Sequence, residues 1–216
     1  EILKSCQRFW GVKKKSMGII NEQLISEYRE IHQTQEYGFT SFNISQDVIP
    51  SIVELEASRV LDYGCGQSLL YTRMKISDNI HIERYDPSIP GIDQPPKTYF
   101  DLVVNTDVLE HIPEDDLNDV IGHIKSLAPN VYFNIHTGLA KVILPSGENA
   151  HCTVKEPEWW LKKISIFFPD SRISEIEGKH CTIKTWPKSN KHLLKRILYK
   201  WREKLEKKRL KFKKYR

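Results

Sequence analysis

Short apolar runs that end at acidic or glycine residues recur through the middle of this chain of 216 residues. Residues 60–63, 80–86 and 99–107 have the length and the apolar or alternating pattern of strands. Helical periodicity at 69–74 separates the first two runs, and it returns at 117–127 after the third. Strands that alternate with helices pair in parallel and bind ligands where their carboxyl ends meet. The pattern therefore predicts an α/β fold with a doubly wound, mostly parallel sheet.

The second half of the chain predicts the rest of this sheet. Residues 130–135 alternate like a strand and deliver His136 to its carboxyl end. A long connection at 138–153 follows, and long connections at this edge of a sheet are more often functional than idle. A helix and two closing strands are expected between residues 156 and 186.

The turn after the first strand is the most specific local pattern. Asp62 ends an apolar run, and Gly64 and Gly66 follow it. Glycine lacks a Cβ atom, so the backbone can turn sharply there and approach a bound molecule closely. A dinucleotide fingerprint would need a third glycine, and Leu69 and Leu70 stand in its place. The turn therefore indicates a nucleoside-like ligand rather than a dinucleotide.

A second acid, Asp86, ends the next strand, where its carboxylate can accept hydrogen bonds from both hydroxyls of a ribose. In chain order, the segments VLDYGCG, YDPS and FDLVVNTDVLEHIPEDDL resemble motif I, the acidic loop and the fourth-strand motif of the class I S-adenosylmethionine-dependent methyltransferases. The resemblance covers residues 50–187. It implies a Rossmann-like sheet with an antiparallel edge hairpin, S-adenosyl-L-methionine as cofactor and S-adenosyl-L-homocysteine as product.

The resemblance also assigns the cofactor site. It implies that Asp62 and the two glycines hold the methionine part, while Asp86 holds the ribose. The expected cofactor-binding residues are Asp62, Tyr63, Gly64, Cys65, Gly66, Gln67, Asp86, Pro87, Asp107 and Val108. Few residues separate Asp86 from Phe100, so the usual third strand must be short, with Asp93 as the candidate adenine-binding acid.

Methyl transfer to a hydroxyl requires in-line alignment and removal of a proton, for which histidine is the natural base near neutral pH. Three histidines, His151, His136 and His111, lie on elements predicted at the rim. We rank His151 first because it lies in a polar loop beside Asn149, and His111 has the alternative of a structural residue at a helix start. Asn149 and Tyr37 are the expected substrate contacts. Asp107 and Glu110 lie near the predicted site, but no set of three metal ligands is evident, so we predict no metal site.

Residues 1–49 are predicted to form a helical cover. Residues 23–32 are amphipathic, and a turn with aromatic residues follows them. Tyr28, His32 and Tyr37 are candidate lid residues, with core packing as the alternative. The chain thus divides into a cover at 1–49, a methyltransferase domain at 50–187 and a tail at 188–216.

The tail is strongly basic, with fourteen Lys or Arg and two Glu in residues 188–216. Four large apolar side chains recur on one face of the predicted helix: Leu194, Leu198, Trp201 and Leu205. Three interpretations stay open. The stripe packs on its own domain or on a second copy to form a homodimer, it binds an anionic membrane surface, or the basic residues contact nucleic acid.

Composition restricts the class of protein. The four cysteines lack paired spacing, which argues against a zinc site and a disulfide framework. No apolar run has the length of a membrane span, and the first residues show no secretion signal. We expect a cytoplasmic protein, with peripheral attachment to the inner face of the cell membrane if the tail binds lipid.

The predicted reaction is O-methylation of a sugar, in a surface glycan or a lipid-linked saccharide, or of a similar hydroxylated small molecule. Two alternatives remain. An RNA methyltransferase would use the tail to bind phosphates, and a non-catalytic module would keep the fold and the cofactor pocket alone.

Overall fold

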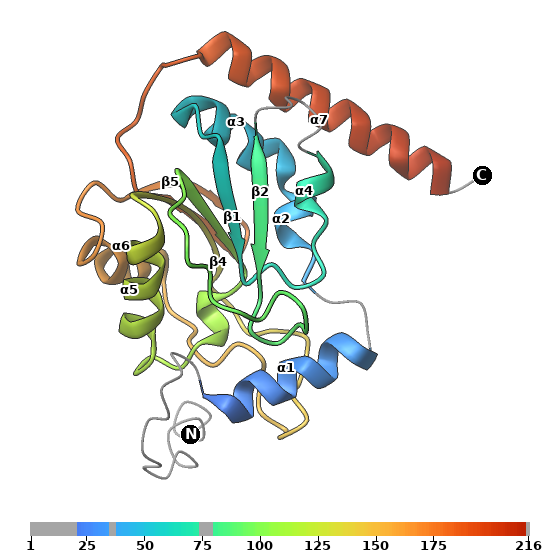
Figure 1. The fold of residues 1–216 in the computed structure, drawn as a ribbon, viewed down its shortest axis with the longest axis vertical. Helices are drawn as coiled ribbons and strands as arrows, with labels where there is room; N and C mark the ends of the chain where they lie inside the picture. Colours follow the sequence, from blue (N-terminus) through green and yellow to red (C-terminus); the bar gives the residue numbers. More distant parts are fainter. Residues whose placement is uncertain (1–20, 35–37, 74–79, 215–216) are drawn as a thin grey trace.

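The computed structural model describes residues 21–34, 38–73 and 80–214. Within these ranges the strands form one six-stranded sheet in the order β2-β1-β3-β4-β6-β5 (Figure 1). The strands are β1 (Arg59–Tyr63), β2 (His81–Tyr85), β3 (Leu102–Thr106), β4 (Asn130–His136), β5 (Arg172–Glu177) and β6 (His180–Lys184). The first four strands are parallel, and β6 is antiparallel to both β4 and β5. The predicted mostly parallel Rossmann-like sheet with an antiparallel edge hairpin is therefore confirmed.

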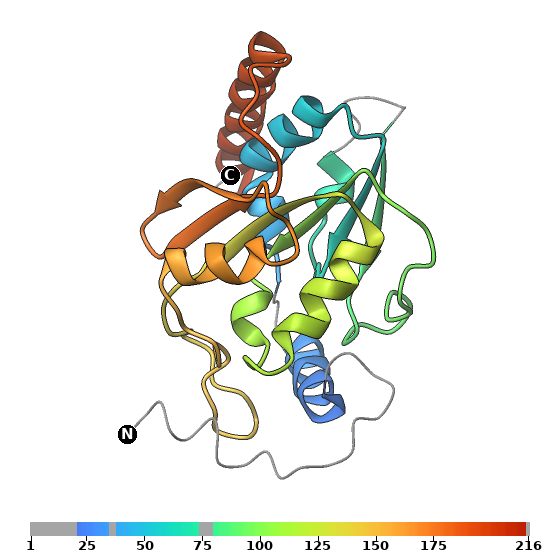
Figure 2. The same ribbon diagram turned by 90° about the vertical axis from the view of Figure 1, so that its left-hand side faces the viewer.

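Helices cover both faces of this sheet (Figures 1 and 2). They are α1 (Glu22–Thr34), α2 (Thr40–Asn43), α3 (Ser45–Leu55), α4 (Leu70–Arg73), the 3₁₀ helix η2 (Leu109–His111), α5 (Leu117–Leu127), α6 (Pro157–Ser165) and α7 (Leu193–Lys214). None of the helices among the described residues is long and apolar enough to cross a membrane.

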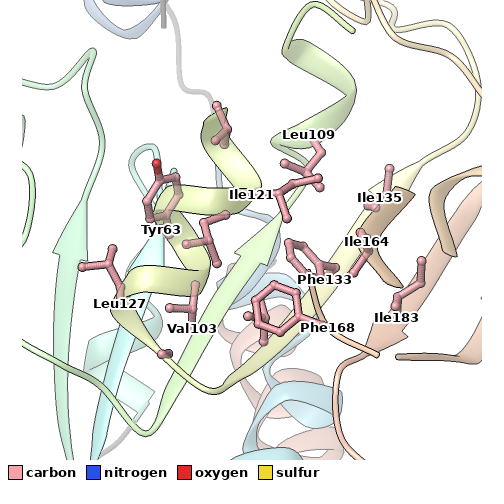
Figure 3. Packing of buried hydrophobic residues seen from close by; sticks show 14 of the residues in the cluster. Tyr63, Val103, Leu109, Ile121, Leu127, Phe133, Ile135, Ile164, Phe168 and Ile183 are labelled. Carbon is pink, nitrogen blue, oxygen red and sulfur yellow. The ribbon is translucent and has the colours of Figure 1, made fainter. Parts of the chain in front are cut away.

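Strand β3 shows how one sheet supports two cores. Successive side chains of a strand point to opposite faces, so Val103 packs in one core and Leu102 and Val104 in the other. The Val103 core also contains Ile121 of α5 and Ile164 of α6 (Figure 3). All five residues of β3 are buried, as expected for a central parallel strand covered on both faces.

The opposite core lies beneath α3. Val48, Ile49 and Ile52 of this helix meet Tyr132 of β4 and Trp186 there. Burying these side chains fixes α3 against the sheet, with its N-terminal end close to the segment that contains Ser41. The position of α3 matters for the tail, because α7 packs against it (Figure 1).

The carboxyl ends of β1, β2 and β3 meet at one edge of the sheet. Tyr63 pairs with Tyr85, and Asp62 pairs with Val104, so β1 lies between its two parallel neighbours. The chain leaves β1 toward β2 on one side and returns to β3 on the other, which creates the crevice where α/β folds bind ligands. Residues 86–101 contain no strand, so the third strand expected in abbreviated form is replaced by a loop.

Candidate active site

A cavity lies at this carboxyl edge, beneath α1. Its wall is formed by Leu24, Ile25, Tyr28, His32, Gly38, Thr40, Tyr63, Gly64, Cys65, Gly66, Asp86, Pro87, Ser88, Thr106, Asp107, Val108, His111, Ile112 and His151. Of the predicted cofactor-binding residues, eight lie on this wall, and Asp62 and Gln67 do not. Tyr37, a predicted substrate contact, falls outside the described residues.

The glycines of the β1 turn are required by the protein's own packing. Gly64 and Gly66 have φ values of 69° and 52°, in the left-handed region. A Cβ on Gly66 would lie 2.8 Å from the Cα of Gly38, and one on Gly64 would lie 2.5 Å from a methyl carbon of Val108. The two glycines therefore let three chain segments meet at the cavity.

Asp86 presents a rigid carboxylate on the cavity wall. Its Oδ2 accepts a hydrogen bond of 2.8 Å from the backbone N–H of Gly66, and its Oδ1 accepts bonds of 2.9 and 2.5 Å from the backbone N–H and hydroxyl of Ser88. The side chain is buried, and these donors fix its orientation. A carboxylate held in this way fits the predicted contact with ribose hydroxyls.

Asp62 has a different position from the one expected for a direct ligand. Its Oδ2 accepts a 2.7 Å hydrogen bond from Ser41, whose hydroxyl lies 2.6 Å from that of Ser68, behind the glycine turn. Its Oδ1 is buried with no hydrogen-bond partner among the described residues. Burial raises the pKa of Asp62 to about 7, although the hydrogen bond from Ser41 acts to lower this pKa. Asp62 thus supports the turn from behind rather than lining the cavity.

Helix α1 closes the cavity from the side opposite the sheet. The Tyr28 hydroxyl lies 2.6 Å from His111 Nδ1 and donates to the carbonyl of Ala150 at 3.1 Å. Gln67 Nε2 donates to the carbonyl of His32 at 2.9 Å, so this residue ties the β1 turn to the helix instead of lining the cavity. Tyr28 and His32 therefore hold positions suited to a lid.

Asp107, at the end of β3, has a φ of 52°, which is uncommon for a residue other than glycine. Its Oδ2 accepts a 2.7 Å hydrogen bond from Thr40, and its Oδ1 lies 3.5 Å from His180 Nδ1. Burial alone would raise the pKa of Asp107, but the hydrogen bonds from His180 and Thr40 outweigh it and the pKa is lowered. Asp107 is therefore an ionised carboxylate at neutral pH.

Four histidine rings follow one another along this side of the site. The ring centroids of His111 and His151 are 4.6 Å apart, those of His151 and His136 are 4.8 Å apart, and those of His136 and His180 are 4.8 Å apart. Of the three predicted bases, His111 and His151 line the cavity, whereas His136 stands behind His151. Sequence reasoning did not single out His180, which lies at the start of β6, far along the chain.

Backbone carbonyls orient the two histidines on the wall. His151 Nδ1 lies 2.6 Å from the carbonyl oxygen of Gly138, and His111 Nδ1 lies 2.8 Å from that of Ala150. A carbonyl oxygen can only accept, so the Gly138 contact places the proton of neutral His151 on Nδ1 and the lone pair on Nε2. Burial lowers the pKa of His151, and it lowers the pKa of His111 to about 4. Both rings are therefore neutral at pH 7.

Asn149 does not line the cavity. Its Oδ1 accepts hydrogen bonds of 3.0 Å from the backbone N–H groups of Ala140 and His151, and its Nδ2 donates to the carbonyl of Ala140 at 3.0 Å. These hydrogen bonds join the side chain to the backbone of its own loop. Asn149 thus positions His151, in contrast to the predicted substrate contact.

The sequence places Glu110 near the site but assigns it no role there. The side chain is fully buried, its Oε1 accepts a 2.8 Å hydrogen bond from the backbone N–H of His136, and its Oε2 has no hydrogen-bond partner among the described residues. Burial, followed by the charge of Asp107, raises the pKa of Glu110 well above its ordinary value.

One ligand atom each from Glu110, His111 and His151 lies within 4.8 Å of the others, a set that could hold a metal ion. His111 and His151 are forty positions apart in the chain, so a search for closely spaced sequence motifs does not find this set.

The sheet order, the glycine turn and the acid of β2 together define a class I methyltransferase fold. A family model described as a methyltransferase domain matches residues 8–193. The chain belongs to this family, as an S-adenosylmethionine-dependent methyltransferase of class I.

Several solved structures are similar to this chain. The DhpI-SAM-HEP complex has 13% sequence identity and a TM-score of 0.51, with 79% of this chain and 99% of that chain covered. The DhpI-SAH complex has 16% identity and a TM-score of 0.49, with coverages of 79% and 97%. The 1,6-didemethyltoxoflavin-N1-methyltransferase of Burkholderia thailandensis has 15% identity and a TM-score of 0.47, with coverages of 80% and 91%. No curated protein matches the sequence.

Proposed function

We propose that this methyltransferase methylates a hydroxyl group of a small, hydroxylated acceptor such as a sugar, with His151 as the general base. One observation carries the proposal: the carbonyl of Gly138 fixes the His151 tautomer, which leaves a proton acceptor on a ring that lines the cavity. The same cavity holds the Asp86 carboxylate, which suits the ribose of the cofactor.

S-adenosylmethionine supplies an electrophilic methyl group when it is bound. The protein's task is to align the acceptor oxygen with that methyl group, to exclude water and to remove the hydroxyl proton. The Asp86 carboxylate and the backbone of the turn at Gly64 and Gly66 would hold the cofactor. Helix α1, with Leu24 and Tyr28 on the cavity wall, would exclude water from above.

Two features of His151 support its proposed role as the base, namely its position on the cavity wall and its protonation state. Burial lowers its pKa, so the ring is unprotonated at neutral pH and its Nε2 can take the proton of an acceptor hydroxyl. The ring of His136 lies behind it, and Asn149 Oδ1 accepts a hydrogen bond from its backbone N–H. These contacts would hold the base in place during the reaction.

The wall around His151 favours a polar acceptor. Asp107 and His111 line the same part of the cavity, and each can exchange hydrogen bonds with hydroxyl groups. The lid formed by α1 favours an acceptor that enters the site as a small group, such as a sugar or the terminal saccharide of a longer glycan. We infer this class from the polar lining and from the cover over the cavity.

The test is the variant His151→Ala, assayed with radiolabelled methyl donor against sugars, sugar nucleotides and lipid-linked saccharides. We expect turnover to fall about 100-fold or more, as is typical for loss of a general base, with unchanged affinity for S-adenosylhomocysteine by calorimetry. The exposed His81, at the start of β2, gives the control variant His81→Ala. Unchanged turnover in His151→Ala would remove His151 as the base, whereas failure of the wild-type protein to bind S-adenosylhomocysteine would contradict the enzymatic function itself.

A second way to activate the hydroxyl is favoured by the buried, unpartnered Oε2 of Glu110. A divalent cation held by Glu110, His111 and His151 would bind the acceptor oxygen directly and lower the pKa of its hydroxyl. Chelation followed by readdition of Mg²⁺ or Mn²⁺ separates the two mechanisms. Turnover that survives chelation supports the histidine base, and turnover that returns only with the ion supports the cation.

A further inference from the structure

The tail helix α7 is attached to the domain through charged and polar pairs with α3, and Tyr199 packs against the core beneath α3. Three pairs join it to α3: Arg196 with Glu54 at 3.0 Å, Lys200 with Asp47 at 2.8 Å, and Glu203 with the Ser45 hydroxyl at 3.0 Å. Just before the helix, Lys191 and His192 both contact the carboxylate of Glu56. The excess positive charge of the tail is thus matched in part by acids along α3, with the two helices side by side (Figure 1).

The apolar stripe of α7 faces solvent. Its exposed fractions are 78% for Leu194, 69% for Leu198, 64% for Trp201 and 63% for Leu205. At 3.6 residues per turn these four positions share one face, roughly opposite the face that contains Arg196. The interpretation in which this stripe packs on its own domain is therefore wrong. The reason is electrostatic, since the acids on α3 hold the opposite, charged face of the helix.

Basic side chains border the exposed stripe. Lys195 and Arg202 follow it along one margin and Lys204 along the other, and all three are exposed. An apolar stripe that contains Trp and Leu, with Lys and Arg at its edges, is the pattern of helices that lie in the interface of a membrane. The apolar side chains enter the headgroup region, and the cations contact anionic lipid headgroups.

Charge distinguishes this partner from a second copy of the chain. Residues 193–214 contain eleven Lys or Arg and two Glu, and one of the two, Glu203, is buried against Ser45. Two copies that met through their stripes would bring the exposed cations of both helices together, with hardly any acid to offset them. A nucleic acid would use the cations, but it would leave the row of Leu side chains in water. An anionic membrane offers an apolar layer to the leucine and tryptophan side chains and negative charge to the bordering cations.

We propose that the outward face of α7, formed by Leu194, Leu198, Trp201 and Leu205 with the bordering cations, binds an anionic membrane surface. The contacts to α3 hold the helix folded before it meets the bilayer, so binding does not require the ordering of a disordered segment. Figure 2 shows α7 beside α3 on the outside of the domain. The proposal goes beyond the methyl-transfer function and does not depend on the identity of the acceptor.

The test is co-flotation of the full-length protein with vesicles of phosphatidylcholine alone or of phosphatidylcholine with phosphatidylserine. We expect binding to the anionic vesicles, and a loss of about tenfold in affinity for each of the variants Leu198→Gln and Trp201→Gln, as removal of one large apolar side chain from the interface predicts. Ile166 is 70% exposed outside α7, so Ile166→Gln is the matched control and should bind like the wild type. A triple variant of Lys195, Arg202 and Lys204 to Gln should lose the preference for phosphatidylserine.

Three results would overturn the proposal. One is equal flotation of wild type and Trp201→Gln, with S-adenosylhomocysteine binding and thermal unfolding unchanged in both proteins. Another is a stable dimer in analytical ultracentrifugation that Trp201→Gln dissociates, combined with no vesicle binding. The third is salt-sensitive binding to single-stranded RNA in the absence of any vesicle binding. Because the substituted side chains point into solvent, the variants should remain folded.

Discussion

The hydroxyl of Tyr28 lies 2.6 Å from Nδ1 of His111, so one residue of the cover helix is bonded to the wall of the site beneath it. The same hydroxyl also donates to the carbonyl of Ala150, next to His151. Tyr28 thus links α1, the segment after β3 and the long loop in one network. Closure of the lid and the position of the proposed base are therefore connected.

Tyr28→Phe removes this link without changing the size of the ring. We expect the free energy of unfolding to fall by about 1 kcal/mol, the typical net contribution of a hydrogen bond, and S-adenosylhomocysteine to bind more weakly because α1 is held less firmly. The control is Tyr99→Phe, at a residue that is 58% exposed. Denaturant unfolding and calorimetry measure both effects. Identical behaviour of the two variants would show that the contact has no role in closing the lid.

Gly66→Ala tests the close approach of the β1 turn to Gly38. Gly66 has a φ of 52°, and Gly178 has a φ of 58° with no atom within 4 Å of an added Cβ, so Gly178→Ala reports the cost of backbone conformation alone. That cost is about 1 kcal/mol. We expect Gly66→Ala to lose clearly more stability, because the new methyl group would lie 2.8 Å from the Cα of Gly38, and to weaken cofactor binding. Equal losses in urea unfolding would argue against a tight contact.

The raised pKa of Asp62 leads to a specific prediction for how the free energy of unfolding depends on pH. Its pKa is raised by burial to about 7 in the folded protein, while an unfolded Asp titrates near 3.8. A raised folded pKa means that the contribution of Asp62 to stability is fully present below about pH 4 and is lost as pH rises toward 7. Asp62→Asn should flatten the stability profile in this window, and Asp115→Asn, at an exposed position, should leave it unchanged. The measurement is the free energy of unfolding in urea from pH 4 to 8.

The proposed base sets the acid limb of the pH–rate profile. Burial lowers the pKa of His151 below the ordinary value of 6.5, so the unprotonated ring persists to more acidic pH than in a free histidine. We expect kcat to stay constant through neutral pH and to fall only at a pH below 6.5. The residual activity of His151→Ala should lack this limb. An acid limb at or above pH 6.5 in the wild-type enzyme would contradict the assignment.

Arg196 anchors α7 to the domain. Its guanidinium lies 3.0 Å from the carboxylate of Glu54, whose side chain is only 1% exposed. Arg196→Met would leave this acid buried without its cation, and breaking such a pair costs about 3 kcal/mol. We expect α7 to separate from α3 and to exchange its amide hydrogens faster. Lys195→Met, at the adjacent exposed residue, is the matched control. Unchanged hydrogen exchange in Arg196→Met would show that the contacts of Lys200 and Glu203 are enough to hold α7 against α3.

The sequence alone predicted much of this molecule, because the information involved is local. The alternation of apolar and polar residues in β2 and β4, the buried run of β3 and the glycines after β1 depend on backbone periodicity and φ preference within a few residues. The acids that end β1 and β2 were identified by their positions at strand ends, and Asp86 does lie on the cavity wall. Parallel strands place their carboxyl ends at one edge, so the cavity's place in the fold also followed from the sequence.

Only the tertiary structure decided which side chains face that cavity. Asp62 turns toward Ser41, and Asn149 forms hydrogen bonds with its own loop. The ring centroids of His111 and His151 are 4.6 Å apart, although the two residues are forty positions apart in the chain. The sequence pattern likewise did not predict which face of α7 packs against the domain. Its amphipathic spacing was plain, but the row of acids along α3 determined that the charged face packs inward and the leucines face outward. Contacts between distant segments depend on strand register, loop paths and charge pairing across elements, and a local pattern does not encode these.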